Sequence, residues 1–172
     1  MPAPTQSLRA RALQWLAQRE HSRIELRRKL LRWARQRADD EASAGASDGE
    51  GHAGDAAEVD ALLDWLEANR HLSDARFVES RVNARAARHG NVRIRRELGQ
   101  HGAALDAATA ERLKSNELHR AGAVWARKYG GRPALEASER ARQMRFLAGR
   151  GFTADVIRRV VQGAALESDD PA

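Results

Sequence analysis

The sequence predicts an all-α protein of three tandem three-helix units, in an elongated, repeat-like arrangement with no β-sheet. Apolar residues recur at spacings of three and four along most of the chain, which is typical of the buried side of a helix. No stretch alternates apolar and polar residues as a half-buried strand does. A pentad of the pattern aliphatic, Arg, Arg, charged, Leu occupies residues 26–30 and returns 68 residues later at 94–98. This echo indicates that one helical unit is repeated.

The first unit is expected to span residues 1–70. Apolar stripes that start at Leu8, Leu26 and Val59 predict its three helices, because the apolar residues that follow fall on one side of a helix. Residues 36–57 interrupt this unit: they are rich in Ala, Gly, Ser and Asp and show no periodicity. Since such a segment has little apolar surface to bury, we expect it to form a flexible acidic loop.

Three glycines of this acidic segment, Gly49, Gly51 and Gly54, satisfy the spacing G-x-G-x-x-G of a dinucleotide-binding turn. That motif works where a strand leads into it and a helix N-terminus receives the pyrophosphate. No strand is predicted before Gly49, and the neighbouring acidic side chains would repel phosphate. We interpret the match as a coincidence and expect no cofactor.

Two further three-helix units are expected at residues 71–116 and 117–166, followed by a disordered acidic tail at 167–172. The leucine that closes the pentad recurs after 68 residues and again, at Leu147, after a further 49. Allowing for the long loop in the first unit, the period is about 50 residues, a length typical of helical repeats. One unit of this size supplies only a marginal core, so neighbouring units are expected to stack.

Polar residues and a glycine indicate where some helices start and stop. Ser22 stands three residues before Glu25, as in a capping box, and Ser73 and Thr153 are also expected to cap helix starts. Gly90 is expected to end a helix, because glycine readily adopts the left-handed conformation common just beyond helix C-termini.

The charge is strongly positive and unevenly distributed. The chain carries 30 Lys and Arg against 24 Asp and Glu, which gives a formal net charge of +6 and a pI near 10.8. Residues 1–37 hold ten basic side chains and two acidic ones, residues 38–75 one basic and eleven acidic, and residues 76–100 seven basic and two acidic. Such a balance favours DNA or another anionic partner.

The sequence lacks the residue patterns of several classes of function. With no cysteine, disulfides, thiol nucleophiles and thiolate metal sites are absent, which fits a reducing cytoplasm. The six histidines are dispersed, and no pair is spaced i, i+4 on one predicted helix. No apolar run approaches the roughly 20 residues that span a bilayer. We therefore expect a cytoplasmic, monomeric protein with no catalytic residues, no metal site and no membrane contact.

Arginine clusters are the candidate binding residues. They lie on the second predicted helix and around the second pentad, at spacings that bring several of them onto one helix face. The alternative is a solvated surface, but these runs lack the interleaved glutamates that would form i, i+4 ion pairs. Phosphate contact by such faces would be salt-sensitive and largely independent of nucleotide sequence. The candidates are Arg23, Arg27, Arg28, Arg32, Arg35, Arg81, Arg85, Arg88, Arg93, Arg95 and Arg96.

Two runs of residues together resemble the signatures of the bacterial RecX regulatory proteins, and the similarity covers essentially residues 8–162. The first is Arg19-Glu20-His21-Ser22 followed by Glu25-Leu26-Arg27-Arg28-Lys29-Leu30. The second comprises Leu72, Asp74, Arg76, Phe77, Arg85, Gly90, Ile94-Arg95-Arg96-Glu97-Leu98 and Gly102.

The resemblance implies a fold of tandem three-helix units and a regulatory role. RecX proteins bind the RecA recombinase, chiefly its filament on single-stranded DNA, and restrain its ATP hydrolysis, strand exchange and co-protease activity; they also bind DNA. It assigns Asp74, Arg76 and Phe77 to the family motif, with Asp74 and Phe77 open to structural roles as a first-turn acid and a core ring.

Two other classes stay open from the residues alone. A DNA-binding module of helix-turn-helix type, serving as an architectural or transcription factor, would bind duplex DNA tightly without RecA. A scaffold for some other acidic protein would be indifferent to DNA.

Overall fold

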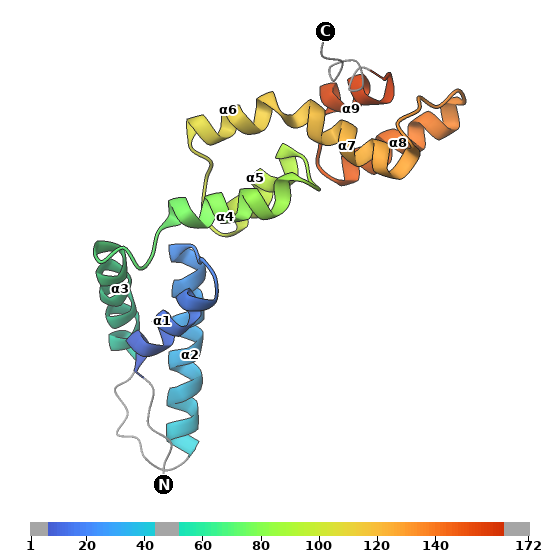
Figure 1. Cartoon of the computed structure of the whole chain (residues 1–172). Coiled ribbons are helices and arrows are strands. Elements are labelled where there is room, and N and C mark those ends of the chain that lie inside the picture. The colour runs from blue at the N-terminus through green and yellow to red at the C-terminus, as the bar shows by residue number, and fades with distance from the viewer. Residues whose placement is uncertain (1–6, 44–51, 164–172) are drawn as a thin grey trace. The chain divides into compact units, whose positions relative to one another are not determined.

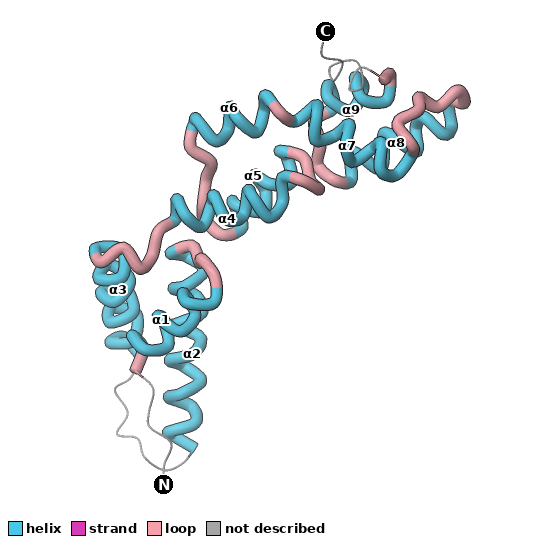
Figure 2. Tube along the Cα trace, in the orientation of Figure 1, coloured by secondary structure: helices cyan, strands magenta, loops and turns pink. Residues whose placement is uncertain are grey.

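The computed structural model describes residues 7–43 and 52–163 of the 172-residue chain. Every regular element in these two ranges is an α-helix, and they run in chain order from α1 to α9 (Figure 1). Loops connect consecutive helices within each described range, and none of the described residues forms a strand (Figure 2). The predicted all-α class is confirmed. The chain divides into two compact units, residues 1–77 and 78–172, and this division falls inside α4.

The first compact unit contains α1 (Leu8–Gln18), α2 (Arg23–Ser43) and α3 (His52–Ala68), each in contact with the other two. Figure 1 shows α2 and α3 running alongside each other. The apolar stripes predicted from the sequence meet in one core, and fully burying each leucine there stabilises the unit by about 2 kcal/mol. The buried core residues are Ala12, Leu26, Leu30, Val59, Leu63, Leu66 and Leu72.

The loop predicted at residues 36–57 is too long, because α2 continues to Ser43 and α3 begins at His52. The central residues 44–51 lie outside the described chain, as do Gly49 and Gly51 of the glycine motif. Beyond Ala34 none of the described side chains of α2 is buried. A helix that is already nucleated needs no core to extend, since each added residue gains one backbone hydrogen bond. The lack of apolar periodicity therefore did not indicate a lack of helix.

Two predicted caps hold the start of α2 and of α4 (Asp74–Ala86). The hydroxyl of Ser22 accepts the backbone N–H three residues later at 3.1 Å, and the hydroxyl of Ser73 does the same at 3.3 Å. In addition, the carboxylate of Asp74 accepts the backbone N–H of Arg23 at 2.8 Å. Asp74 therefore satisfies a free amide at the start of a helix 51 residues earlier in the chain.

The second compact unit holds most of α4 and the five helices that follow it: α5 (Asn91–Gln100), α6 (Ala107–Ser115), α7 (Glu117–Tyr129), α8 (Ala137–Gly149) and α9 (Ala154–Val161). Helices α7, α8 and α9 pack around an apolar cluster at the end of the chain. Its buried members are Ala121, Val124, Trp125, Leu147, Phe152, Ile157, Val160 and Val161.

Only Asn116 separates α6 from α7, and the two helices follow one another almost as a single rod in Figure 1. Asn116 has φ −100° and ψ 4°, which interrupts the helical hydrogen bonding for one residue.

Gly90 does not end a helix in the left-handed conformation, contrary to prediction. Helix α4 ends at Ala86, and Gly90 instead precedes α5 with φ −80° and ψ 170°. A Cβ atom at Gly90 would lie 2.2 Å from the carbonyl oxygen of Gly151. The N–H groups of Gly90 and Val92 donate to the carbonyls of Arg150 and Gly151, both at 3.0 Å. Glycine is needed here because two backbones touch.

A buried polar network joins the start of α5 to α7 and to the start of α9. The carboxylate of Glu117, which is 2% exposed, accepts the backbone and side-chain N–H groups of Asn91 at 2.9 and 3.0 Å. It also accepts the hydroxyl of Thr153 at 3.1 Å. Thr153 stands at the N-cap position of α9, as predicted, but its hydroxyl donates to Glu117 and does not cap the helix.

Arg120 completes this network from one turn along α7. Its guanidinium donates to the side-chain oxygen of Asn91 at 2.6 Å and to that of Asn116 at 2.7 Å. Burial lowers the pKa of Arg120 and the nearby charge of Glu117 opposes the shift. A buried charge is tolerated only when its donors are paired, and backbone carbonyls complete the pairing here. Those carbonyls belong to Ala86, His89 and Leu113.

We expect Gly90→Ala to lower the free energy of unfolding by about 1–3 kcal/mol, because the new methyl group forces two backbones apart. Urea unfolding of the whole chain measures this. Gly99→Ala is the matched control: a Cβ at Gly99 meets nothing within 4 Å, so it should stabilise α5 by about 0.5–1 kcal/mol. Equal effects of the two substitutions would contradict the close backbone contact.

Arg120→Ala is expected to lower the free energy of unfolding by about 3–5 kcal/mol, because it leaves the Glu117 carboxylate buried without a compensating charge. The exposed Arg112 of α6 provides the control, and Arg112→Ala should change stability by no more than about 0.5 kcal/mol. Thermal or urea unfolding measures both, and a small loss for Arg120→Ala would show that the network is dispensable.

Candidate functional site

Two of the candidate arginines on α2 form ion pairs with acidic residues of α3 in the first compact unit. Arg23 pairs with Asp64 and with Glu67 of α3, each at 2.6 Å. Arg27 makes a two-pronged pair with Asp60, with Nε and Nη2 at 2.6 and 2.9 Å from the two carboxylate oxygens. These arginines therefore join α2 to α3.

The ion pair with Asp60 was not visible in the sequence, because the acid comes from a different helix, 33 residues away. Its hydrogen bond and charge raise the pKa of Arg27, and the hydrogen bond from Arg27 lowers the pKa of Asp60. Both groups are exposed to solvent, so the pair orients α3 more than it stabilises it. The absence of interleaved glutamates on α2 was therefore no sign that its arginines lack internal partners.

The remaining candidates on α2, Arg28, Arg32 and Arg35, have exposed side chains. Their spacings of three and four place them on one helix face, as predicted. Arg32 and Arg35 form no ion pair with any residue that the structure describes. The exposed Arg32 and Arg35 are therefore candidates for contact with an anionic partner.

The arginines around the second pentad also fall into two groups, those that bind a carboxylate within the unit and those that are exposed. Arg81 and Arg85 of α4 both approach the carboxylate of Glu97 on α5, at 3.5 and 3.0 Å. Arg95 and Arg96 are exposed on α5, whereas the aliphatic residues of the pentad are 1% exposed and lie in the core. Arg88 and Arg93 are also exposed.

The three family-motif residues have structural partners in the first compact unit. Asp74 binds the start of α2, as described above. Arg76 donates to the carboxylate of Glu20 at 2.8 Å and to the carbonyl of His71 at 3.0 Å. Phe77 is fully buried. The motif therefore holds the first turn of α4 in place.

His21, also in the resemblance signature, is a buried histidine between two cationic residues. Its Nδ1 is 2.9 Å from the carbonyl of Arg19 and its Nε2 is 3.1 Å from Nζ of Lys29. These partners assign a neutral ring that donates from Nδ1 and accepts at Nε2. Burial, followed by the charges of Arg19 and Lys29, lowers the pKa of His21, although the Arg19 carbonyl and Glu25 act in the opposite direction.

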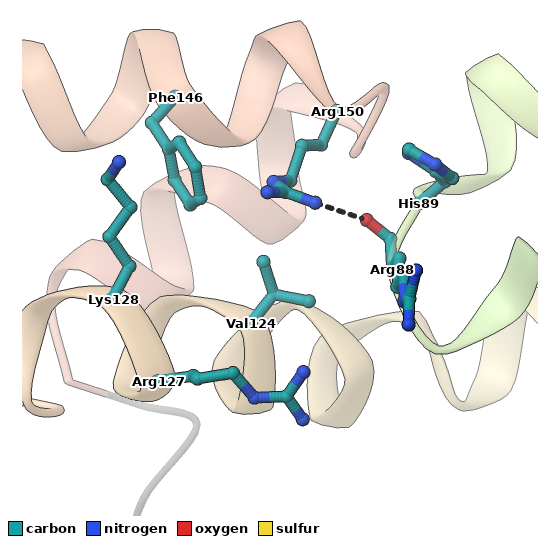
Figure 3. Close-up of a pocket in the computed structure, with 7 residues that line it drawn as sticks. All are labelled: Arg88, His89, Val124, Arg127, Lys128, Phe146 and Arg150. Atoms are coloured by element: carbon teal, nitrogen blue, oxygen red, sulfur yellow. Dashed lines mark hydrogen bonds between the residues drawn. The ribbon is translucent and has the colours of Figure 1, made fainter.

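The second compact unit contains a basic pocket that the sequence analysis did not predict, because the candidate arginines included only Arg88 of its cationic residues. It has a volume of about 620 Å³ (Figure 3). Its cationic residues come from the turn after α4, from the last turn of α7 and from the end of α8. The adjacent basic residues Arg127 and Lys128 could have indicated a basic site. The sequence does not show, however, that the fold places them near Arg88 and Arg150.

The described residues contain neither a metal-binding cluster nor a membrane-spanning helix. None of its clusters of His, Asp and Glu has the composition to hold a metal ion. No described helix combines the length and the apolar character needed to cross a membrane.

The fold and these surfaces define an α-helical protein of tandem three-helix domains with arginine-rich outer faces. Sequence profiles of the second and third three-helix domains of RecX match residues 73–110 and 116–161. Regulatory protein RecX of Ralstonia nicotianae is 43% identical over 172 residues, which cover 99% of this chain and 96% of the relative. Regulatory protein RecX of Herbaspirillum seropedicae is 45% identical over 174 residues and covers both chains completely. The chain belongs to the RecX family of regulatory proteins.

A solved structure supports the fold. The crystal structure of RecX from Lactobacillus salivarius superposes with a TM-score of 0.62, covering 92% of this chain and 95% of that one. At 18% sequence identity this likeness concerns the fold alone. The predicted fold of three-helix units is thereby confirmed.

We expect the stability of the protein to fall as the pH drops below about 6.5, in part through His21. Its folded-state pKa is lowered, so the unfolded chain binds a proton at this position before the folded chain does. The stability advantage of the wild type over His21→Gln should therefore shrink between pH 8 and pH 5.5. Urea unfolding at both pH values measures it, and the contribution of other groups cancels in the difference. A constant difference would contradict the neutral buried ring.

Proposed function

We propose that the chain is a negative regulator of RecA. In this proposal it binds the RecA filament on single-stranded DNA and restrains ATP hydrolysis, strand exchange and co-protease activity, and thereby modulates recombination and DNA repair. The observation that carries the proposal is the 43–45% identity, along nearly the whole chain, to proteins named regulatory protein RecX. We further propose that it acts in the cytoplasm as a monomer, with three-helix domains at residues 1–70, 71–116 and 117–166.

The exposed arginines are the proposed contacts to DNA phosphates or to acidic RecA surface. Arg32 and Arg35 on α2, and Arg95 and Arg96 on α5, are exposed. Such side chains can donate two hydrogen bonds to one phosphate or carboxylate. Arg23, Arg27, Arg81 and Arg85 would first have to give up the carboxylates that they bind within the chain. We therefore assign them a smaller part in binding.

Tandem domains suit a filament because a filament repeats the same surface. Once one domain is bound, the next one searches at a high effective concentration, and modest contacts at each domain add to a strong total affinity. A protein that spans neighbouring RecA protomers would oppose the movements that accompany hydrolysis and extension. Contacts to phosphate would make this affinity fall as the salt concentration rises.

The direct test is RecA ATP hydrolysis on single-stranded DNA. We expect inhibition by wild-type protein at less than one molecule per RecA protomer. The double substitution Arg95→Ala, Arg96→Ala should raise the concentration needed for half inhibition by about tenfold, since two charge-assisted hydrogen bonds are lost. Arg158→Ala, Arg159→Ala removes an adjacent exposed pair from α9 and should leave inhibition unchanged.

Other outcomes of the same assay contradict the proposal. No inhibition at equimolar protein would exclude regulation of RecA. Tight, sequence-dependent binding to duplex DNA without an effect on RecA would favour the helix-turn-helix alternative. Indifference to both DNA and RecA would favour a scaffold for another acidic protein.

A further inference from the structure

The basic pocket of the second compact unit brings together residues from three places in the chain. Figure 3 shows Phe146 and Arg150 on one side and Val124 on the facing helix, with the turn that carries His89 closing one end. The lining residues are Arg88, His89, Val124, Arg127, Lys128, Phe146 and Arg150. Four of the seven are arginine or lysine, and none of these described lining residues is acidic.

Two polar atoms of the lining residues are buried. The Nε of Arg150 and the Nδ1 of His89 have no hydrogen-bond partner among the residues that the structure describes. Another nitrogen of the Arg150 guanidinium, Nη1, donates a hydrogen bond to the carbonyl of Arg88 at 3.2 Å. Arg88 and Arg127 form no ion pair within the described residues. The cationic side chains of the pocket are therefore not neutralised by carboxylates from the described chain, which favours an anionic ligand there.

The apolar residues of the pocket hold its cations in position. The Lys128 ammonium and the Arg150 guanidinium each lie 4.8 Å from the centre of the Phe146 ring. Attraction between a cation and the face of an aromatic ring restricts both side chains before any ligand binds. Figure 3 shows Lys128 reaching from α7 toward the ring and Arg150 reaching back toward the turn after α4. Phe146 therefore lies between the two cations and holds both at the side of the pocket that faces Val124.

We propose that this pocket is a phosphate-binding site, which takes adjacent phosphate groups of a free nucleotide or of a nucleic-acid backbone. Guanidinium and ammonium donors that line one pocket from three parts of the chain suit an anion with many acceptor oxygens, such as phosphate. A planar carboxylate would satisfy fewer of them. This proposal is independent of the proposed regulatory function, because it is argued only from the residues that line the pocket.

Pyrophosphate is the probe, and isothermal titration calorimetry on the full chain measures its binding. The double substitution Arg127→Ala, Lys128→Ala should weaken binding by about tenfold or more, since two charged donors are lost. The matched control is Arg145→Ala, Arg159→Ala, which removes two exposed cations of α8 and α9 outside the pocket and should leave binding unchanged. Circular dichroism verifies that both variants are folded.

Competition separates the two sources of phosphate. ATP and a short single-stranded oligonucleotide are each titrated against bound pyrophosphate, and displacement by either one supports the site and identifies its ligand. Equal displacement by polyglutamate would overturn phosphate selectivity. No binding of pyrophosphate, or an equal loss in the control variant, would overturn the site itself.

A measurement on the unmodified protein keeps the proposal falsifiable if the pocket variant does not fold. In the free protein, burial and the charges of Arg93, Arg150 and Arg85 lower the pKa of His89, while Glu97 opposes this effect. A bound phosphate would favour the protonated ring. Pyrophosphate should therefore raise the pKa of His89 in an NMR titration, and an unchanged pKa would overturn the proposal. The RecA assay does not involve this titration, so failure of one proposal is distinguishable from failure of the other.

Discussion

The second compact unit depends on one buried polar network, in which Glu117 and Arg120 of α7 both bind Asn91 at the start of α5. Apolar contacts tolerate small shifts of one helix against another, whereas these hydrogen bonds are satisfied in a single arrangement. Arg120 also binds the carbonyls of Ala86 and His89, and so fixes the turn between α4 and α5. That turn provides one wall of the basic pocket, and α7 provides another. The geometry of the pocket is therefore a consequence of the network.

Close backbone contact strengthens the same junction. The glycines Gly90 and Gly151 let the start of α5 approach the turn before α9, and the start of α5 donates two backbone hydrogen bonds to carbonyls of that turn. The network and the contact together join the two stretches that match the second and third three-helix domains of RecX. These domains behave as one compact unit because polar groups, and not apolar surface alone, connect them.

The arginines of this chain serve two different purposes. Arg23 and Arg27 bind carboxylates of α3, and Arg81 and Arg85 bind Glu97, so they orient helices within the units. Arg32 and Arg35 of α2 and Arg95 and Arg96 of α5 have exposed side chains instead. A strongly basic chain needs the first group, because unpaired positive charge opposes compact folding, and the second group is the one that we propose for binding.

Helical periodicity, the repeated pentad and the caps at Ser22 and Ser73 are local patterns, and they determined the fold class and the core faces, while the two signature runs indicated the family. The extent of α2, the role of Gly90 and the partners of the arginines were decided by the tertiary structure. Each of these depends on residues from other helices, such as the Asp60 that binds Arg27 or the Gly151 that approaches Gly90. The pocket is the clearest case, because its cations are separated by up to 62 residues along the chain and meet only after α4, α7 and α8 have packed. Local sequence decides which face of a helix is buried, but only packing decides which faces meet.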